Sequence, residues 1–275
     1  MSRAGAKRGK RLSHVWEGLQ PDLKNSLKAK MKKGEVTIGT TISIGHPDIA
    51  ETLGQVGYDW ILIDTEHAPL EVGTVQNLMQ AMSGSKSVPI VRVAWNDMVM
   101  IKRALDIGAY GIIVPWVNTK EEAERAVQAV RYPPRGLRGF GPRRASLFDP
   151  EYVATAENEL ILAVQIETKK AIDNLDEILS VDGIDAAVIG PADLSFSLGM
   201  LMQYDNPKFN AALDKVVAAT RKHHVAAGFL AVDNIERRVK QGFTWLNVSA
   251  DLGLLKSSAK KDYEEAVKGA KAAKK

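Results

Sequence analysis

The sequence predicts an α/β protein built as a (β/α)₈ TIM barrel. Short apolar stretches alternate with helix-like stretches along most of the 275 residues. Eight strand–helix units in about 250 residues match the size of this fold. An open doubly wound sheet is the alternative, but the units follow one another evenly and no Gly-rich nucleotide-binding motif follows the first strand.

The expected strands are short apolar runs, which are typical of parallel sheets covered on both faces. The first run is rich in β-branched residues, which favour strands over helices. In chain order, the strands are expected at residues 36–44, 58–64, 88–93, 111–115, 161–166, 185–189, 226–231 and 243–249.

The expected helices lie between these strands and end at turn residues such as Gly57 and Ser83-Gly84-Ser85. They are expected at residues 48–56, 72–82, 97–105, 120–130, 170–179, 209–222 and 235–240. A further helix over residues 13–30 precedes the first strand, and we expect it to cap the bottom of the barrel.

One connection, residues 131–159, is much longer than the others and is rich in proline, glycine and arginine. Connections of this length in a compact domain are usually functional or disordered. Because it comes after the fourth strand, we expect it beside the catalytic face of the barrel. It would either face a partner or substrate, or form a mobile surface loop with solvated arginines.

The composition limits the chemistry. The chain has no cysteine, which excludes disulfides, thiolate zinc sites and a cysteine nucleophile. Any metal is therefore expected on oxygen or imidazole ligands. No apolar run approaches the roughly 20 residues of a membrane span. The N-terminus lacks the apolar core of a signal peptide, so we expect a cytoplasmic protein.

Three segments are expected: a flexible basic extension at residues 1–12, a barrel domain at 13–262, and a Lys-rich C-terminal helix or tail at 263–275. The net charge is +4, and much of the basic excess lies near the two ends. Basic tails bind nucleic acid in some proteins. The basic stretches at residues 3–11 and 268–275 contain no aromatic side chains for base stacking, so we expect solvated tails.

Two carboxylates, Glu167 and Asp193, each follow an apolar run that is expected to be a buried strand. The carboxyl ends of parallel barrel strands meet at one face, so these two acids would form a site for a hard divalent cation. Without a metal, each would serve as a helix-capping acid, because helices are expected just after both.

Residues beside these acids are suited to a small ligand. The turn Gly190-Pro191-Ala192 would bring backbone amides close to a bound carboxylate. Gln165 lies two residues before Glu167, so strand alternation puts both side chains on one face, expected to be the barrel interior.

Three ionisable residues, Asp64, Glu66 and His67, crowd the end of the second expected strand. Histidine is the side chain best suited to move protons near neutral pH, and a nearby carboxylate would orient its ring. A structural histidine is the alternative. Arg92, near the end of the third strand, needs an anion. It would form an ion pair with Asp64 or Glu66, stabilise a developing oxyanion, or do both.

A Schiff-base mechanism needs a desolvated lysine, typically at a strand end inside the barrel. No lysine ends an expected strand, since Lys102, Lys120 and Lys169 fall on expected helices or loops. This pattern argues against imine chemistry and favours a metal.

Several motifs together resemble the HpcH/HpaI aldolases, the class II pyruvate aldolases that include 4-hydroxy-2-oxoheptanedioate and 2-dehydro-3-deoxyglucarate aldolases. The resemblance runs from Gly39 to Leu255, and its combination of motifs is specific. The main motifs are LIDTEHAP at 62–69, PIVRV at 89–93, WND at 95–97, RYPP at 131–134, GLRG at 136–139, VQIET at 164–168 and GPADLS at 190–195.

The resemblance implies reversible cleavage of a 4-hydroxy-2-keto acid to pyruvate and an aldehyde. It implies that Glu167 and Asp193 bind Mg²⁺, Mn²⁺ or Co²⁺. Gln165 and the backbone at Ala192 would hold the substrate. His67, next to Asp64, would act as a base through a water molecule. Arg92 and the metal would stabilise the pyruvate enolate.

The resemblance also matches Asp106 to an aspartate that makes the histidine more basic. Asp106 ends a helix before the fourth strand, so we expect it at the bottom of its own barrel, whereas His67 is expected at the top. Asp106 would therefore serve a histidine of a neighbouring subunit. The family implies a homohexamer, a trimer of dimers, with exchanged C-terminal helices.

Two alternatives remain open from the sequence. An acyl-CoA lyase of the citrate lyase β-like branch would need a site for the CoA phosphates, which Arg143 and Arg144 would supply. A nucleic-acid or scaffold role would depend on the basic termini and is less favoured, because nothing beyond tail charge indicates it.

Overall fold

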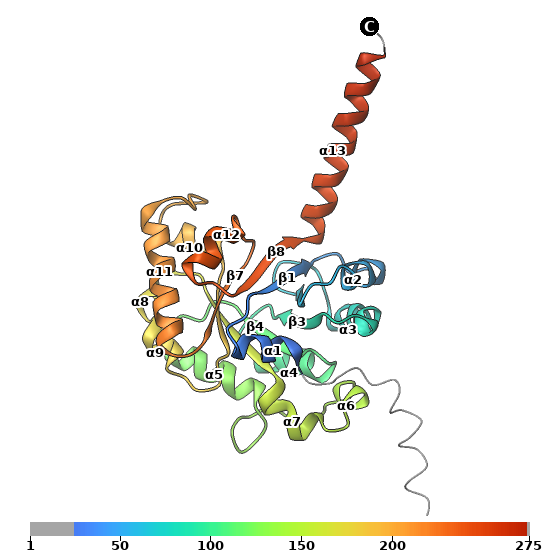
Figure 1. Cartoon of the computed structure of the whole chain (residues 1–275). Helices are drawn as coiled ribbons and strands as arrows, with labels where there is room; N and C mark the ends of the chain where they lie inside the picture. The colour runs from blue at the N-terminus through green and yellow to red at the C-terminus, as the bar shows by residue number, and fades with distance from the viewer. Residues whose placement is uncertain (1–24, 274–275) are drawn as a thin grey trace, which may run out of the picture.

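A closed barrel of eight parallel strands forms the core of the computed structural model, which describes residues 25–273 (Figure 1). The strands pair in chain order, and β8 closes the barrel against β1. The predicted TIM barrel is confirmed. The strands are β1 (Thr37–Ile42), β2 (Trp60–Asp64), β3 (Val88–Arg92), β4 (Gly111–Val114), β5 (Ile161–Ile166), β6 (Ala186–Ile189), β7 (Ala226–Phe229) and β8 (Trp245–Ala250).

Helices surround the barrel, and most agree with the sequence prediction within a few residues. The helix expected at residues 170–179 is instead two short helices that meet at Asn174. The helices are α1 (Ser26–Lys32), α2 (Pro47–Gly54), α3 (Val72–Ala81), the 3₁₀ turn η1 (Met82–Gly84), α4 (Met98–Asp106), α5 (Lys120–Val130), α6 (Ala145–Phe148), α7 (Tyr152–Glu159), α8 (Lys169–Asp173), α9 (Leu175–Leu179), α10 (Pro191–Ser197), α11 (Pro207–Lys222), α12 (Ile235–Gln241) and α13 (Asp251–Ala272).

Large apolar side chains fill the interior of the barrel. The rings of Trp60 and Trp245 lie 4.7 Å apart, centroid to centroid, and both residues are almost fully buried. Gly39 on β1 leaves room for them, because a Cβ atom there would lie 2.3 Å from the Trp60 ring. The interior of the barrel is therefore a packed core and not a pore.

α1 covers the amino-terminal face of the barrel. Lys28 reaches across this face, where its Nζ donates to the carbonyl oxygen of Leu160 at 2.6 Å and lies 2.8 Å from Asp185 Oδ1. Both partners directly precede a strand. The predicted capping helix is thus present, but it begins at Ser26, and the predicted residues 13–24 lie outside the described residues.

The long connection at residues 131–159 also lies on the amino-terminal face. It joins α5 to β5, and Arg144 Nη1 donates to the carbonyl oxygen of Ile107 in the turn between α4 and β4, at 2.9 Å. The prediction that it sits beside the catalytic face is wrong. A connection from a helix to the next strand returns to the amino end of that strand, and here it contains α6 and α7.

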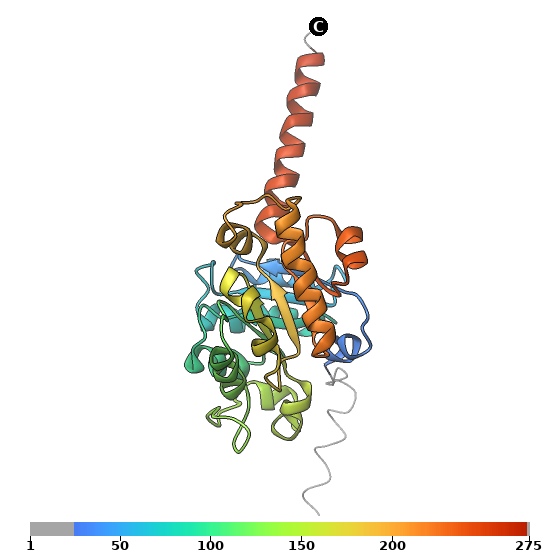
Figure 2. The same cartoon turned by 90° about the vertical axis from the view of Figure 1, so that its left-hand side faces the viewer.

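α13 projects away from the barrel (Figures 1 and 2). Its first residue, Asp251, is fixed by hydrogen bonds from the backbone N–H groups of Ser43 and Ile44, at 2.8 and 2.7 Å. Nearly every following residue to Ala273 is exposed. The helix crosses the expected boundary between residues 262 and 263, and the three-segment division stays a prediction.

Within residues 25–273, no helix combines the length and apolar character needed to cross a membrane.

Candidate active site

A cavity of about 750 Å³ opens at the carboxyl-terminal end of the barrel. Its walls come from the ends of several strands, the loops after them, and the first turns of α13. Eight of the residues selected from the sequence line this cavity: Asp64, His67, Arg92, Gln165, Gly190, Pro191, Ala192 and Asp193. The structure therefore brings together residues that are up to 129 positions apart, from 64 to 193.

Asp64 and Arg92 form a bidentate ion pair across the ends of β2 and β3. Arg92 Nε and Nη2 donate to the two oxygens of Asp64 at 2.9 and 2.7 Å. Burial alone would raise the pKa of Asp64, but the hydrogen bonds and charge of Arg92 hold that pKa below its usual value. Asp64 is thus a firmly ionised anchor for Arg92.

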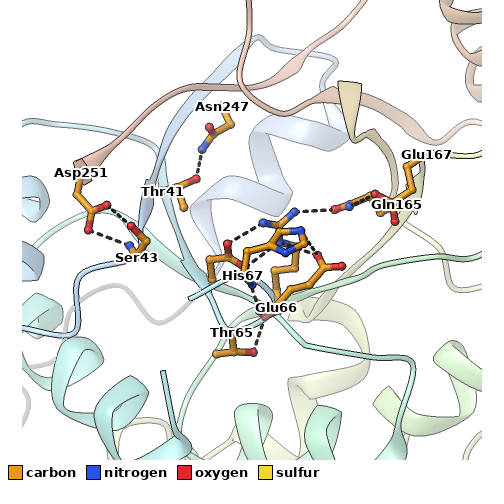
Figure 3. Close-up of polar contacts among 11 residues, drawn as sticks. Thr41, Ser43, Thr65, Glu66, His67, Gln165, Glu167, Asn247 and Asp251 are labelled. Carbon is orange, nitrogen blue, oxygen red and sulfur yellow. Dashed lines mark hydrogen bonds and ion pairs between the residues drawn. The ribbon is translucent and has the colours of Figure 1, made fainter. Parts of the chain in front are cut away.

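Arg92 has two further partners, Glu66 and Gln165, which are both labelled in Figure 3. Its Nε lies 3.2 Å from Glu66 Oε2, and its Nη1 donates to Gln165 Oε1 at 3.4 Å. From the sequence, either Asp64 or Glu66 was a possible partner of Arg92. In the structure, Arg92 pairs with both. The guanidinium also remains on the cavity wall, so its charge stays available to a ligand.

His67 has its ring largely exposed to the cavity, with 62% of the side chain accessible. Glu66 Oε2 lies 3.6 Å from its Nε2, whereas Asp64 Oδ1 accepts from the backbone N–H of His67 at 3.4 Å. The carboxylate beside the ring is therefore Glu66. From the sequence, Glu66 was only an ionisable neighbour and a possible partner of Arg92; its place next to His67 is the signal that also indicates this contact.

Gln165 and Glu167 share one face of β5, as strand alternation predicts. Gln165 Nε2 donates to Glu167 Oε2, and the backbone N–H of Trp116 donates to Glu167 Oε1 at 2.7 Å. Trp116 adopts the left-handed conformation, with φ of 56°, which is rare for a bulky residue. Sequence reasoning missed Trp116, because its contribution is a backbone group that no side-chain pattern reveals.

The turn at Gly190 must pass very close to Glu167. A Cβ atom at Gly190 would lie 2.6 Å from Glu167 Oε2 and 3.2 Å from Gln165 Nε2. Glycine is required here for this close approach, since its φ of −90° is open to any residue. Asp193 follows in the first turn of α10 and is exposed to the cavity.

The site holds more negative than positive charge. Burial raises the pKa of Glu66 to about 7, against the opposing charge of Arg92, and Asp64 and Asp193 raise it further. Burial likewise raises the pKa of Glu167 to about 7, with Glu66 and Asp193 adding to the effect. Four carboxyl groups thus surround one guanidinium, and a bound cation would relieve their repulsion.

The donor set fits a hard divalent cation that keeps part of its coordination for other ligands. Among residues 25–273, no group of three or more histidine, cysteine, aspartate or glutamate side chains could hold a metal. Glu167 and Asp193 offer two carboxylate donors, and a cation held by both would take its other ligands from water and substrate. That is the way Mg²⁺ is commonly bound in enzymes.

Asp106 lies at the opposite face, at the end of α4, as the sequence predicted. Its Oδ1 is 2.7 Å from Arg138 Nη2, and it is not on the wall of the cavity that holds His67. Asp106 and His67 of one chain lie at opposite ends of the packed barrel, so Asp106 does not contact its own His67. Its predicted role at a neighbouring subunit stays a prediction.

Arg143 and Arg144 belong to the same amino-terminal region as Asp106. Arg144 is bonded to the carbonyl oxygen of Ile107, and neither arginine lines the cavity. They therefore give no support to a CoA-phosphate site beside His67, and the acyl-CoA alternative loses the one feature that indicated it.

Comparisons with known proteins agree with this geometry. A sequence profile of the HpcH/HpaI aldolase/citrate lyase family matches residues 41–258. The 5-keto-4-deoxy-D-glucarate aldolase of Citrobacter koseri is 37% identical over 242 residues, covering 86% of this chain and 94% of that protein.

Two solved structures are similar over most of the chain. An HpcH/HpaI aldolase/citrate lyase family protein from Burkholderia cenocepacia is 34% identical with a TM-score of 0.83, covering 88% of this chain and 99% of that one. The HpcH/HpaI aldolase from Desulfitobacterium hafniense is 31% identical with a TM-score of 0.82, covering 87% and 96%. The barrel, the cavity and these matches together show that the chain belongs to the HpcH/HpaI aldolase/citrate lyase family.

Proposed function

We propose that this protein is a divalent-metal-dependent aldolase, a carbon–carbon lyase that reversibly cleaves a 4-hydroxy-2-keto acid to pyruvate and an aldehyde. The observation that carries the proposal is the gathering of four carboxyl groups, Asp64, Glu66, Glu167 and Asp193, with Arg92 at one end of the barrel. Glu66 and Glu167 have pKa values raised to about 7, close to Asp193 and with one guanidinium among them. Such a site favours a cation and an anionic substrate that binds to it.

Glu167 and Asp193 are the residues that would hold the metal, as Mg²⁺, Mn²⁺ or Co²⁺. When bound, the metal supplies a Lewis acid that polarises the keto group of the substrate. Gln165 and the Trp116 backbone keep Glu167 in one orientation through their hydrogen bonds to its two oxygens. Such outer contacts set the geometry of a metal ligand and are important for affinity.

Gln165 and the backbone at Ala192 are proposed to hold the pyruvate half. Both lie on the cavity wall, at the ends of the adjacent strands β5 and β6. Gln165 is itself held between Arg92 and Glu167, so its amide has little freedom to turn. A substrate bound there would lie beside both proposed metal ligands, with its reacting carbons facing the open cavity.

His67 is proposed to remove the proton from the 4-hydroxyl group. The electrons of that O–H bond then form the aldehyde carbonyl, the C3–C4 bond breaks, and its electron pair passes to the pyruvate half as an enolate. Arg92 supplies fixed positive charge to the enolate oxygen, where preorganised charge contributes most. Asp64 positions Arg92, and Glu66 positions the imidazole ring from 3.6 Å.

The assembly is proposed to be a homohexamer, a trimer of dimers, in which α13 is exchanged between subunits. Most of the stability of a helix in a protein comes from packing of its apolar face, yet α13 leaves the barrel with Leu254, Leu255 and Tyr263 exposed. Packing against a second subunit would cover these side chains. Asp106, on the face opposite His67, would then serve a histidine of a neighbouring subunit.

We propose 2-keto-3-deoxy sugar acids as the substrate class. Acids of the 4-hydroxy-2-oxoheptanedioate type are the second class to be tested. The name of the relative from Citrobacter koseri, 5-keto-4-deoxy-D-glucarate aldolase, supports the sugar-acid choice. It places the proposed role in the catabolism of carbohydrate acids.

The direct test is pyruvate release from a panel of 4-hydroxy-2-keto acids, measured with Mg²⁺ or Mn²⁺ and again with a chelator. Pyruvate should appear only with the metal. If no acid in the panel releases pyruvate, or if the chelator has no effect, the proposed function is wrong.

A further inference from the structure

The cavity wall contains a charge that the proposed reaction does not use. Three cationic or potentially cationic side chains line it: His67, Arg92 and Lys256. Arg92 is paired with Asp64 and Glu66. Lys256 makes no ion pair or side-chain hydrogen bond with any residue between 25 and 273 in the structure. It is therefore a lysine on the cavity wall whose charge is free for a ligand.

The position of Lys256 is built into the fold. Leu252, Gly253 and Lys256 occupy one side of α13, at i, i+1 and i+4, and all three line the cavity. The start of this helix is clamped to the loop after β1, because Asp251 also accepts from the Ser43 hydroxyl at 2.6 Å. The clamp, seen at the left of Figure 3, aims this side of α13 at the cavity.

Lys256 stands away from the proposed pyruvate subsite. That subsite lies at the ends of β5 and β6, whereas α13 follows β8, which is three strands from β5 around the barrel. A cavity of about 750 Å³ falls within the range that holds ligands much larger than pyruvate. The remaining space, toward α13, is where the aldehyde half of a substrate would extend.

The other polar side chains on the α13 side are already occupied. The Ser43 hydroxyl is bonded to Asp251, and the Ser249 hydroxyl lies 2.7 Å from that of Thr40. Asn247 donates to the Thr41 hydroxyl at 3.0 Å. Lys256 is thus the one group on this side of the cavity, among the described residues, that offers a full charge to a substrate.

We propose that Lys256 is a specificity-determining residue that binds the carboxylate of an acidic aldehyde half, so that the enzyme favours substrates with an acid group at both ends. The inference rests on the proposed aldolase function. It assigns the far end of the substrate, which neither the metal ligands nor Gln165 contact. An ammonium on a flexible stem suits acid groups at slightly different distances from the reacting carbon.

The test compares aldehydes that differ only in charge. Wild-type protein with Mn²⁺ and pyruvate is given tartronate semialdehyde or glyceraldehyde, and in a second, longer pair succinic semialdehyde or butanal. The readout is the ratio of kcat/KM for the acidic over the neutral member of each pair. Lys256→Met keeps the apolar stem and removes the charge, and Lys256→Arg keeps the charge.

Lys256→Met should reduce the acidic preference about tenfold in at least one pair, as expected for one partly exposed charge-assisted contact. Lys256→Arg should restore it, and added salt should weaken the wild-type preference. Lys260→Met is the matched control, one turn further along α13, where Lys260 pairs with Glu264 at 3.7 Å and does not line the cavity.

The outcomes separate this inference from the function on which it rests. An unchanged ratio in Lys256→Met, in a wild-type enzyme that is active, overturns the inference and leaves the aldolase function standing. An equal fall in kcat/KM for acidic and neutral aldehydes also overturns the inference, because it indicates a general effect on the reaction and no recognition of the acid group. If wild-type protein uses no aldehyde at all, the aldolase function fails and the inference falls with it.

Discussion

Two arginine–aspartate pairs, at opposite ends of the same barrel, show how similar ion pairs serve different purposes. At the carboxyl-terminal end, Arg92 pairs with Asp64 at 2.7 Å and 12% of its side chain is exposed. At the amino-terminal end, Arg138 pairs with Asp106 at the same distance and is fully buried. Arg92 binds Asp64 through two hydrogen bonds and Arg138 binds Asp106 through one, but the larger difference lies in the surroundings of the two pairs.

Arg138 is enclosed by groups that bind both of its terminal nitrogens, while its Nε has no hydrogen-bond partner among the described residues. It donates to the Tyr152 hydroxyl at 3.0 Å, and its guanidinium carbon lies 4.5 Å from the centre of the Tyr132 ring. Arg138 does not line the cavity that holds the candidate site residues. This pair joins the long connection at residues 131–159 to the end of α4 and acts as a structural brace.

Arg92 instead lies on a cavity wall beside more carboxyl groups than it neutralises. Asp64 holds it, while Glu66, Glu167 and Asp193 leave a negative excess that a metal would balance. A buried ion pair alone is weak evidence of function. The Arg92 pair differs in two ways: it lies on an open cavity, and more carboxyl groups than cationic groups surround it. Separate substitutions can test each of these features.

The largest expected effect is the loss of activity in Arg92→Lys. Lysine cannot donate to both Asp64 oxygens and still present charge to the enolate, so kcat/KM for pyruvate formation should fall by about 10³-fold. The melting temperature should change little in comparison. Activity within tenfold of wild type would show that Arg92 is only structural.

Arg138→Met should have the converse effect. Removing one partner of a buried pair leaves Asp106 without its cation, and the free energy of unfolding should fall by about 3 kcal/mol, measured in urea. Arg138→Lys should recover part of this loss. A stability equal to wild type would contradict the role of this pair as a brace.

Gly190→Ala tests the close packing behind the proposed metal ligand. A methyl group there would meet Glu167 Oε2 at 2.6 Å, so the carboxylate must shift. We expect the metal affinity to fall about 10-fold to 100-fold, the range for disturbing the outer contacts of a ligand, measured by Mn²⁺ titration. Gly73→Ala on α3 is the control, because nothing lies within 4 Å of the added methyl group. Gly199→Ala is unsuitable, because its φ of 75° strains any residue with a side chain.

The smallest effect concerns pH and the metal-free protein. The folded-state pKa of Glu167, about 7, lies above its unfolded value of about 4.5. Between these values the folded protein binds the extra proton, so this group makes the metal-free protein more stable as pH falls from 8 toward 5. Glu167→Gln should flatten this dependence and raise the melting temperature at pH 8 by about 3 °C in the presence of a chelator.

An unchanged pH dependence in Glu167→Gln would show that burial of this carboxyl group carries no cost. The matched variant is Glu157→Gln, at a half-exposed position on α7 whose carboxyl group pairs with Arg135 and lies outside the cavity. It should leave the pH dependence of the melting temperature as in wild type.

The sequence was most informative where a side chain's place follows from the strand that precedes it. Apolar runs placed all eight strands, and residues shortly after a strand, such as His67 and Glu167, were therefore placed at one end of the barrel. It was least informative for contacts that depend on folding in three dimensions. The Trp116 backbone contact and the choice of Glu66 as the neighbour of the His67 ring are of this kind.

The error over residues 131–159 has a different origin. We expected the connection beside the catalytic face because it comes after the fourth strand, but α5 lies between β4 and this connection. A connection from α5 to β5 lies on the amino-terminal face. The order of the helices and strands decides on which face of the barrel a connection lies, whatever its composition. α13 begins immediately after β8 and therefore crosses the expected boundary between residues 262 and 263.

The most direct test of the central claim, that Glu167 and Asp193 form a cation-dependent enolate site, is the exchange of the C3 protons of pyruvate in D₂O, followed by NMR. This reaction needs no aldehyde and reports enolate formation alone. Wild-type protein with Mg²⁺ should exchange these protons, while chelator, Glu167→Gln and Asp193→Asn should each abolish the exchange. Exchange that persists in chelator, or in a folded Glu167→Gln variant, would contradict the claim.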